Sequence, residues 1–391
     1  MSVSKNNVLP PLIVIVALML TILVMRGPIT CVGALADEII SALQIGYPAY
    51  GFLSALPIIC FGLFCAVAPT MSKRYGLLLT VLICLGLILA GTLGRLIPIY
   101  SVMLLATGLI GIGIAILNVL MPVLLRDYFP KNIPLVMGVF TGFIGFSGSI
   151  GAYFSVPLLN ASGSLQISLG LWVLMVGLAL LLWFLSPRGK QITVSGGVFE
   201  WVLLKKPLTW AVIFVMGMQS LTIYTTVAWL PTILSTLGFS ASTSGLGSAV
   251  FLLVSAPASI LTAAYIKLVR GERPAALIMA LSFAIGVVLW LQGGTWSFVG
   301  CVLAGIPQGI TFSMAMILMA QKTNNLSELL VISSLAQGIG YVLAGLGPFI
   351  CGLLYQGDGQ WWPVATFMLG AVALWGVSAL YAFGDRKLFD Y

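Results

Sequence analysis

The sequence contains little charge. Asp, Glu, Lys and Arg make up 7% of its 391 residues, whereas an average soluble domain carries about 25%. Hydrophobic residues make up 60% of the chain, and the mean hydropathy is +1.15. Such a chain cannot cover a surface that faces water, which excludes a secreted domain, a cytosolic enzyme and a nucleic-acid-binding domain. We therefore expect the lipid bilayer to be its surroundings.

Histidine is absent, which removes the commonest metal ligand and the usual proton shuttle. The six cysteines lie in apolar runs without a CxxC pair, and cysteine in such a setting behaves as a small hydrophobe. The nine acidic residues all fall in loops or at the ends of predicted helices. We therefore expect no cofactor, metal site or catalytic residues, and we predict that the protein is not an enzyme.

Apolar runs long enough to cross a bilayer occur twelve times, since a spanning helix needs about 20 such residues. The first half contains the runs 10–36, 49–70, 76–94, 98–125, 133–159 and 166–186. The second half contains the runs 208–235, 241–267, 274–292, 295–321, 328–355 and 362–384. The sequence therefore predicts an all-α polytopic membrane protein. The first run is too long for a signal peptide, so we predict that it is a true spanning helix.

The longest polar stretch extends from Ser186 to Lys206 and divides the runs six and six. It predicts an N-terminal bundle over 1–186, a cytoplasmic linker over 187–207 and a C-terminal bundle over 208–391. With the N-terminus inside, 15 of the 17 Lys and Arg residues fall on the cytoplasmic side, where positive charge is retained. This placement explains the net charge of +8 without a nucleic-acid partner. We expect both termini in the cytoplasm.

Arg26 lies about halfway along the first predicted helix. An arginine at the centre of an isolated spanning helix costs at least about 2.5 kcal/mol, so this side chain must face the bundle interior or a watery cavity. No acidic residue lies in the interior of any predicted span to neutralise it. A buried arginine without an acidic partner has two possible roles. The sequence favours a fixed counter-charge for an anionic substrate over a structural cation bound to backbone carbonyl groups. Gly27 and Pro28 loosen the helix directly after it.

Neutral polar and aromatic side chains stand in the helices that we expect to line the same cavity. Each is a candidate ligand or a hydrogen bond between helices, and together they predict a polar cup around one cation. The predicted substrate-binding residues are Arg26, Thr30, Asn118, Gln219, Tyr224, Trp229, Gln308, Gln337 and Tyr341. Asp37 and Glu38, at the outer end of the first helix, are either ordinary interfacial charges or candidates for proton coupling.

Short motifs in several helices point to a known family. They are Met25-Arg26-Gly27-Pro28, Asn118-Val119-Leu120-Met121-Pro122, Ala228-Trp229-Leu230-Pro231 and Gln337-Gly338-Ile339-Gly340-Tyr341 with Ala344-Gly345. With these motifs the chain resembles the cyanate permease and nitroimidazole transporter branch of the major facilitator superfamily over essentially its full length. The resemblance implies a bacterial inner-membrane transporter whose two halves alternate access to a midplane site. It also implies small anions or small polar heterocycles as substrates.

Two functions stay open at this point. The first is secondary transport of a small anion or polar compound (cyanate-like, carboxylate or nitroimidazole-like), with Arg26 as the counter-charge. The alternative is efflux of neutral antimicrobial compounds through a pocket lined by Tyr224, Trp229 and Tyr341. For either function we expect a small-molecule partner and a monomer, because each half supplies one wall of the cavity.

Overall fold

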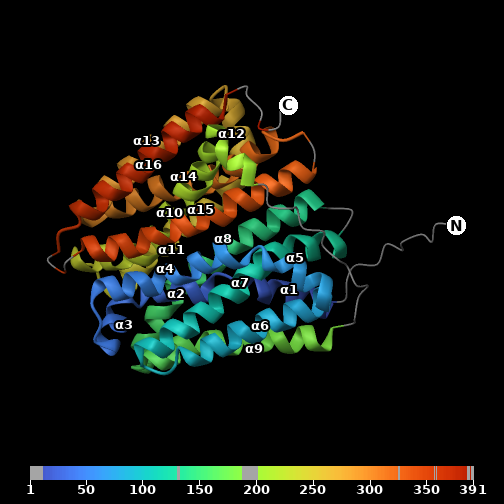
Figure 1. Ribbon diagram of the computed structural model, residues 1–391. Helices are drawn as coiled ribbons and strands as arrows, with labels where there is room; N and C mark the ends of the chain where they lie inside the picture. Colours follow the sequence, from blue (N-terminus) through green and yellow to red (C-terminus); the bar gives the residue numbers. More distant parts are fainter. Residues whose placement is uncertain are drawn as a thin grey trace.

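The computed structural model describes residues 12–129, 133–186, 201–324, 326–355, 357, 359–384 and 388, and among these residues it contains helices and no strand (Figure 1). The first half consists of α1 (Leu12–Val24), α2 (Gly27–Ala34), α3 (Ala36–Leu43), α4 (Tyr47–Phe64), α5 (Val67–Tyr75), α6 (Leu77–Gly94), α7 (Tyr100–Tyr128), α8 (Ile133–Ser162) and α9 (Leu165–Leu185). The second half consists of the short 3₁₀ helix η1 (Trp201–Lys205), α10 (Pro207–Thr236), α11 (Ala241–Ile260), α12 (Thr262–Leu268), α13 (Glu272–Trp290), α14 (Gly294–Gln321), α15 (Leu326–Leu354) and α16 (Trp362–Ala382).

The twelve predicted spans are confirmed. Twelve segments of the described chain are long and apolar enough to cross a membrane, from Leu12–Ala34 to Trp362–Ala382. The chain is therefore a multi-pass membrane protein. Most of the predicted linker over 187–207 lies outside the described residues, and its last part forms η1.

Two predicted spans are too long, and both are the second span of their half. The predicted run 49–70 is divided between α4 and α5, and the predicted run 241–267 is divided between α11 and α12. The short second helix is basic in its last turn in both cases, with Lys73 and Arg74 in α5 and Lys267 in α12. Positive side chains favour the aqueous edge of the membrane, so the continuous spanning helix ends before them.

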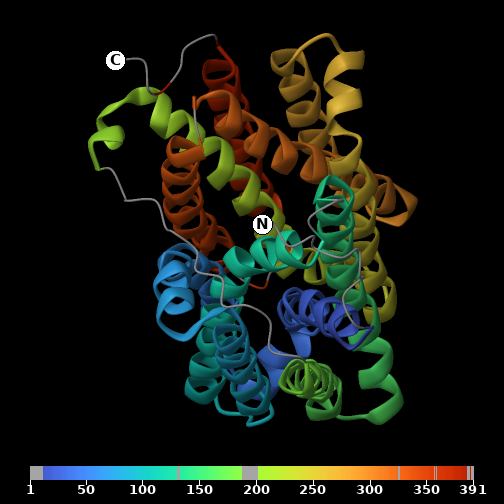
Figure 2. The same ribbon diagram turned by 90° about the vertical axis from the view of Figure 1, so that its right-hand side faces the viewer.

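The two halves pack side by side, with α4 along α15 and α8 along α11. Viewed from the side on which the chain ends lie, the blue-to-green first half and the second half, which runs from yellow-green to red, occupy separate regions that meet at these pairs (Figure 2). Small residues permit the close approach of helices in lipid. A Cβ atom added to Gly62 of α4 would lie 2.4 Å from the carbonyl oxygen of Gly338 in α15.

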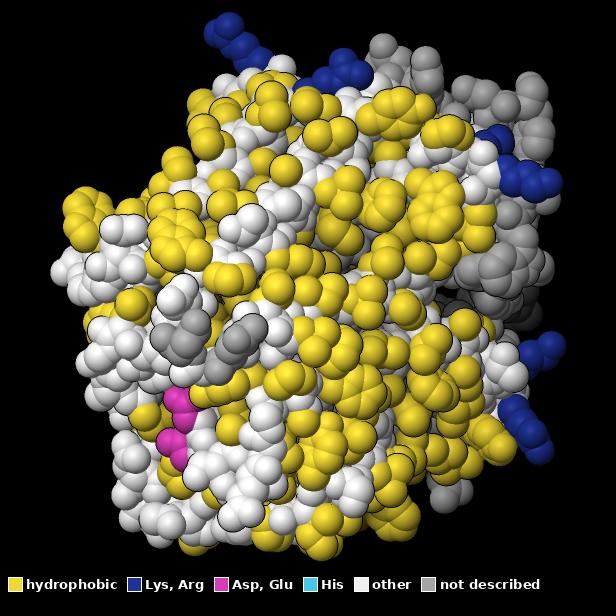
Figure 3. Space-filling view, turned by 60° about the vertical axis from the view of Figure 1, so that its left-hand side comes forward, with side chains coloured by type: hydrophobic (Ala, Val, Ile, Leu, Met, Phe, Trp, Pro, Cys, Tyr) yellow, Lys and Arg dark blue, Asp and Glu magenta, His cyan; other side chains and the backbone are white. Residues whose placement is uncertain are grey.

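Hydrophobic side chains cover much of the outer surface that Figure 3 shows. Large residues such as Leu105, Leu174 and Phe184 are exposed there, as expected for contact with lipid tails. The Lys and Arg side chains in this view gather along one side of the molecule, and the acidic side chains lie on the opposite side (Figure 3). We call the first side, where the described chain ends lie, the terminal side.

Candidate functional site

A cavity lies between the two halves at mid-length of the helices, with an empty volume of about 910 Å³. This volume is within the range of about 300–1,000 Å³ that is typical of small-molecule sites. Its walls come from α2, α8, α10, α11, α14 and α15, and its polar lining residues are Arg26, Thr30, Gln219, Ser220, Tyr224, Ser255, Ser259, Gln308 and Tyr341. The described lining contains no Asp or Glu. Among the described residues, Arg26 is therefore the one charged side chain that lines the cavity.

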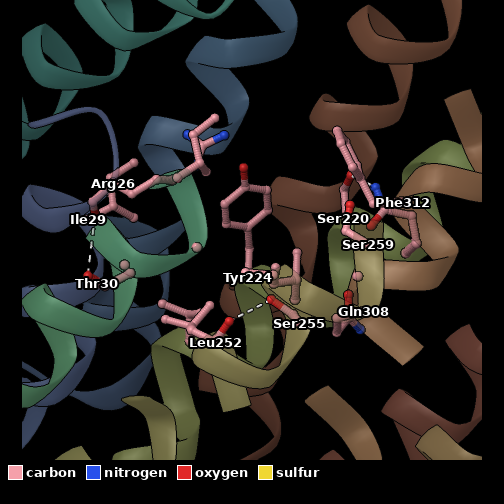
Figure 4. Close-up of a pocket in the computed structure, with 18 of the residues that line it drawn as sticks. Arg26, Ile29, Thr30, Ser220, Tyr224, Leu252, Ser255, Ser259, Gln308 and Phe312 are labelled. Carbon is pink, nitrogen blue, oxygen red and sulfur yellow. Dashed lines mark hydrogen bonds between the residues drawn. The ribbon is translucent and has the colours of Figure 1, made fainter. Parts of the chain in front are cut away.

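Arg26 stands in the break between α1 and α2. Its guanidinium extends toward the centre of the cavity and Tyr224 (Figure 4). The Nη1 atom donates a long hydrogen bond of 3.4 Å to the carbonyl oxygen of Met25, and Cζ lies 5.5 Å from the centre of the Phe61 ring. The described chain places no salt-bridge partner against this guanidinium. Its positive charge is therefore available to a ligand.

The break that positions Arg26 follows from the residues after it. Pro28 lacks a backbone N–H and begins a new helix readily. A Cβ atom on Gly27 would lie 1.7 Å from Cη2 of the buried Trp172 in α9, so this position requires glycine. The Thr30 hydroxyl donates to the carbonyl oxygens of Arg26 and Gly27, at 3.4 and 3.3 Å. These contacts fix the start of α2 and hold Arg26 at the cavity.

Three aromatic rings from both halves surround the guanidinium. Phe61 of α4 contacts Tyr224 of α10 and Tyr341 of α15 edge-on, with ring centres 6.1 and 5.8 Å apart. The two tyrosine rings are themselves 6.4 Å apart. Neither tyrosine hydroxyl forms a hydrogen bond within the described residues. The wall near Arg26 thus combines flat apolar surfaces with two hydroxyl groups that can bind a ligand.

The second half supplies the wall opposite Arg26. Figure 4 shows Ser255, Ser259 and Gln308 on the far side of Tyr224 from Arg26. The Gln308 side chain is 3% exposed, and its Nε2 donates to Thr222 Oγ1 at 2.7 Å. This wall carries amide and hydroxyl groups without charge.

The structure brings together six of the nine predicted binding residues. These six come from the break before α2 and from the four helices α2, α10, α14 and α15; they are Arg26, Thr30, Gln219, Tyr224, Gln308 and Tyr341. The other three lie outside the cavity lining. Asn118 is half-buried on α7, and its Nδ2 has no hydrogen-bond partner. Gln337 donates from Nε2 to Ser333 Oγ within α15 at 2.7 Å.

Trp229, the third of these, belongs to an aromatic cluster that closes the cavity on the side opposite the terminal side. It is fully buried, its Nε1 donates to the carbonyl oxygen of Pro348 at 2.9 Å, and the Tyr50 ring stands edge-on to it at 5.1 Å. The indole ring of Trp361 stacks on Tyr355 with ring centres 3.8 Å apart. We call the cluster the aromatic seal; its members are Tyr47, Tyr50, Trp229, Tyr355 and Trp361.

Asp37 and Glu38 lie in α3, at the same closed end and away from the cavity lining. Asp37 Oδ2 accepts a hydrogen bond of 2.9 Å from Ser235 Oγ of α10, which joins the two halves. Burial raises the pKa of Glu38 above its ordinary value, and the neighbouring charge of Asp37 raises it further. A role of these carboxylates in coupling stays a prediction.

Sequence reasoning missed two parts of the site. The first is the contribution of α8 and α11, including Ser255 and Ser259, whose spacing of four residues places them on one helix face. The second is Arg95, at the end of α6, which is 4% exposed. Its Nε donates to Thr107 Oγ1 at 3.0 Å and its Nη1 donates to the carbonyl oxygen of Pro28. Arg95 therefore supports the helix break that carries Arg26.

Comparison with known families gives a match to the Major Facilitator Superfamily model over residues 18–345. Similar in sequence are the transporter YycB of Bacillus subtilis strain 168, at 28% identity over 94% of this chain and 92% of the relative, and the 2-nitroimidazole transporter of Escherichia coli K12, at 27% identity over 92% and 91%. The cyanate transport protein CynX of Escherichia coli K12 is 25% identical over 86% of this chain and 88% of the relative.

The fold is also found among solved structures. A bacterial homologue of the human lysosomal transporter Spinster, in an inward-facing and occupied conformation, aligns over 95% of both chains with a TM-score of 0.75 and 16% identity. At this identity the likeness concerns the fold alone.

Proposed function

Because the chain belongs to the major facilitator superfamily, we propose that it is a secondary transporter for a small anion or small polar organic compound. The compounds we have in mind are cyanate-like, carboxylate-like or nitroimidazole-like. Transport proceeds by alternating access of the cavity to the two sides of a bacterial inner membrane, with both termini in the cytoplasm. A monomer suffices, because one chain supplies both walls. The names of the relatives at 25–27% identity support this range of substrates.

The observation that carries the proposal is the charge of the cavity. Arg26 faces a space of about 910 Å³ whose lining contains no carboxylate. An ionisable side chain within the membrane is costly unless it is partnered, and it commonly marks a substrate pathway. A substrate with negative charge, or with an electron-rich group such as a nitro group, supplies the missing partner. We assign Arg26 the role of substrate counter-charge.

The aromatic rings of Phe61, Tyr224 and Tyr341 support a second candidate function, the efflux of neutral compounds. Flat neutral molecules bind well between such rings, and these rings contact one another across the two halves. In that function Arg26 stabilises the fold as a structural cation and does not bind the substrate. The two functions differ in how binding depends on the guanidinium.

The test is ligand-induced thermal stabilisation of the purified protein, with wild type and Arg26→Ala side by side. The panel contains cyanate, nitrate, short and aromatic carboxylates, and neutral nitroimidazoles. A ligand that binds the folded state raises the melting temperature according to its occupancy. We expect an electron-rich compound to stabilise the wild type, and we expect its affinity for Arg26→Ala to be at least about tenfold lower, because a charge-assisted hydrogen bond is lost.

Arg74→Ala serves as the control, since Arg74 is an exposed cation in the last turn of α5. It should bind the same compounds as the wild type. If anion binding survives in Arg26→Ala, the counter-charge role is wrong. If neutral heterocycles stabilise both proteins equally, the efflux of neutral compounds becomes the better account.

A further inference from the structure

The amide of Gln308 has a defined orientation in the wall opposite Arg26. Its Nε2 donates to Thr222 Oγ1 at 2.7 Å, and Thr222 donates its own proton to the carbonyl oxygen of Gln219 at 2.8 Å. Because that hydroxyl proton is already used, Thr222 can only accept from Gln308. The nitrogen of the amide must therefore face Thr222, which leaves the oxygen Oε1 without a hydrogen-bond partner within the described residues.

We infer that this oxygen lies on the cavity side, because the nitrogen of the same amide is held on the other side. Gln308 lines the cavity, whereas Thr222, to which its nitrogen points, is not among the lining residues. The nitrogen is thus turned away from the cavity and the oxygen is the amide atom left for a ligand. The side chain is 3% exposed, and a buried acceptor of this kind is normally satisfied by a donor.

The serines on the same wall also present acceptors. Ser255 Oγ donates its proton to the carbonyl oxygen of Leu252 at 2.7 Å. The hydroxyls of Ser259 and Ser313 lie 2.9 Å apart and share a hydrogen bond in which either oxygen can be the donor. With its proton used inside the protein, Ser255 offers the lone pairs of its oxygen. Gln308 and Ser255 therefore present acceptors opposite the donors of Arg26.

We propose that Gln308 Oε1 accepts a hydrogen bond from an N–H group of the substrate. This inference rests on the proposed function and narrows it to planar compounds that carry an electron-rich group at one end and an N–H at the other. The electron-rich end binds Arg26, the ring lies among Tyr224 and its aromatic neighbours, and the N–H faces Gln308. Ions without an N–H, such as cyanate, leave Gln308 Oε1 unpaired.

Two isomeric probes test the role of the N–H. 4-Methyl-2-nitroimidazole keeps the ring N–H, and 1-methyl-2-nitroimidazole replaces it with a methyl group, so the two have the same atoms and the same nitro group. Their affinities for the wild-type protein are measured by isothermal titration calorimetry, beside 2-nitroimidazole itself. We expect the N-methyl isomer to bind at least about tenfold more weakly, because the buried acceptor is then left unpaired.

The variant Gln308→Met keeps the length of the side chain and removes the acceptor. We expect the ratio between the two isomers to fall close to one in this variant. Gln292→Met is the control, since Gln292 is exposed just after α13 and is not among the residues that line the cavity; it should keep the wild-type ratio. If Gln308→Met fails to fold, the affinities of the wild type for the two isomers still test whether binding requires the N–H of the substrate.

The outcomes separate this inference from the proposed function. Equal affinity of the wild type for both isomers, with binding lost in Arg26→Ala, overturns the role of Gln308 and leaves the counter-charge standing. If the protein binds cyanate but no nitroimidazole, the role of Gln308 is likewise overturned and the counter-charge role of Arg26 stands. Binding of no compound in the panel overturns the proposed function itself.

Discussion

Arg26 is held at the cavity by its neighbours rather than by a partner for its charge. The helix breaks at this residue because Pro28 starts a new helix and Gly27 admits the ring of Trp172, and Arg95 donates to the carbonyl oxygen of Pro28. The arrangement fixes the backbone and leaves the guanidinium for a ligand. A site built this way requires little rearrangement when substrate binds.

Gly27→Ala tests the supports of Arg26. The added Cβ would lie 1.7 Å from the buried Trp172 ring, and overpacking of this kind typically costs about 1–3 kcal/mol. We expect a lower melting temperature than that of the wild type and weaker stabilisation by the substrate. The matched control is Gly86→Ala in α6, where an added Cβ meets nothing within 4 Å.

Gly86→Ala should keep the wild-type melting temperature or raise it, because alanine favours a helix over glycine. A Gly27→Ala protein as stable as Gly86→Ala would mean that the close packing against Trp172 does not fix the break.

At the scale of single residues, sequence could identify Arg26 because a charge in an apolar run is conspicuous. It could not separate Gln308, which lines the cavity, from Gln337, which bonds within its own helix, since both are glutamines in apolar helices. The difference depends on which helix face meets the other half. Arg95 was left unassigned because it stands at the end of a predicted span, where an arginine is ordinarily exposed.

Among the elements, the aromatic seal joins α4 of the first half to α10 and to the connection between α15 and α16 of the second, where Tyr355 and Trp361 lie. Tyr50 Oη lies 3.1 Å from the carbonyl oxygens of both Val32 and Ala228, one in each half. A Cβ atom on Gly33 would lie 2.0 Å from the carbonyl oxygen of Val227, so α2 and α10 are in direct contact here. Motion of the halves that opens this end must break the seal.

Trp229→Ala removes the central ring of the seal. The loss of a buried tryptophan side chain typically costs about 3–5 kcal/mol, and here the lost contacts hold the closed end together. We expect the cavity to be open on this side for a larger fraction of the time. The measurement is the rate at which a membrane-impermeant maleimide, added outside intact cells, labels Val227→Cys in a background without the six native cysteines.

The rate should rise severalfold in Trp229→Ala. Trp375→Ala is the control, because Trp375 is a buried tryptophan of α16 that does not belong to the seal. If both variants label at the same rate, the seal is an ordinary part of the core and does not control access.

The elements themselves were largely predictable from composition, since only helices satisfy the backbone of an apolar chain in lipid. The divisions between α4 and α5 and between α11 and α12 were not, because the apolar runs continue across them. The meeting of Trp229 with Tyr355 and Trp361 also could not be predicted, as it depends on the packing of the halves.

For the whole molecule, the distribution of charge predicts the orientation. The Lys and Arg side chains that Figure 3 shows gather on the terminal side, whereas Arg95 is buried at the end of α6. Because cytoplasmic loops retain positive charge, we expect this side to face the cytoplasm. A fluorescent reporter that matures only in the cytoplasm should be bright when fused to the C-terminus, and a periplasmic reporter enzyme at the same position should be inactive. The reverse result would invert the assignment.

Composition and charge thus predict the number of spans, and they predict the division into halves with a site between them. They do not indicate which end of the cavity is closed, because each half has the same sequence in every state of a transport cycle.

The role proposed for Arg26 is that of the substrate's counter-charge in a transporter. Its most direct test is uptake of radiolabelled 2-nitroimidazole and cyanate by proteoliposomes containing wild type, Arg26→Ala or Arg26→Lys at equal protein content. We predict saturable uptake of at least one compound by the wild type. We predict its loss in Arg26→Ala and partial retention in Arg26→Lys, which keeps the charge but not the planar guanidinium. Equal uptake by wild type and Arg26→Ala would contradict the claim.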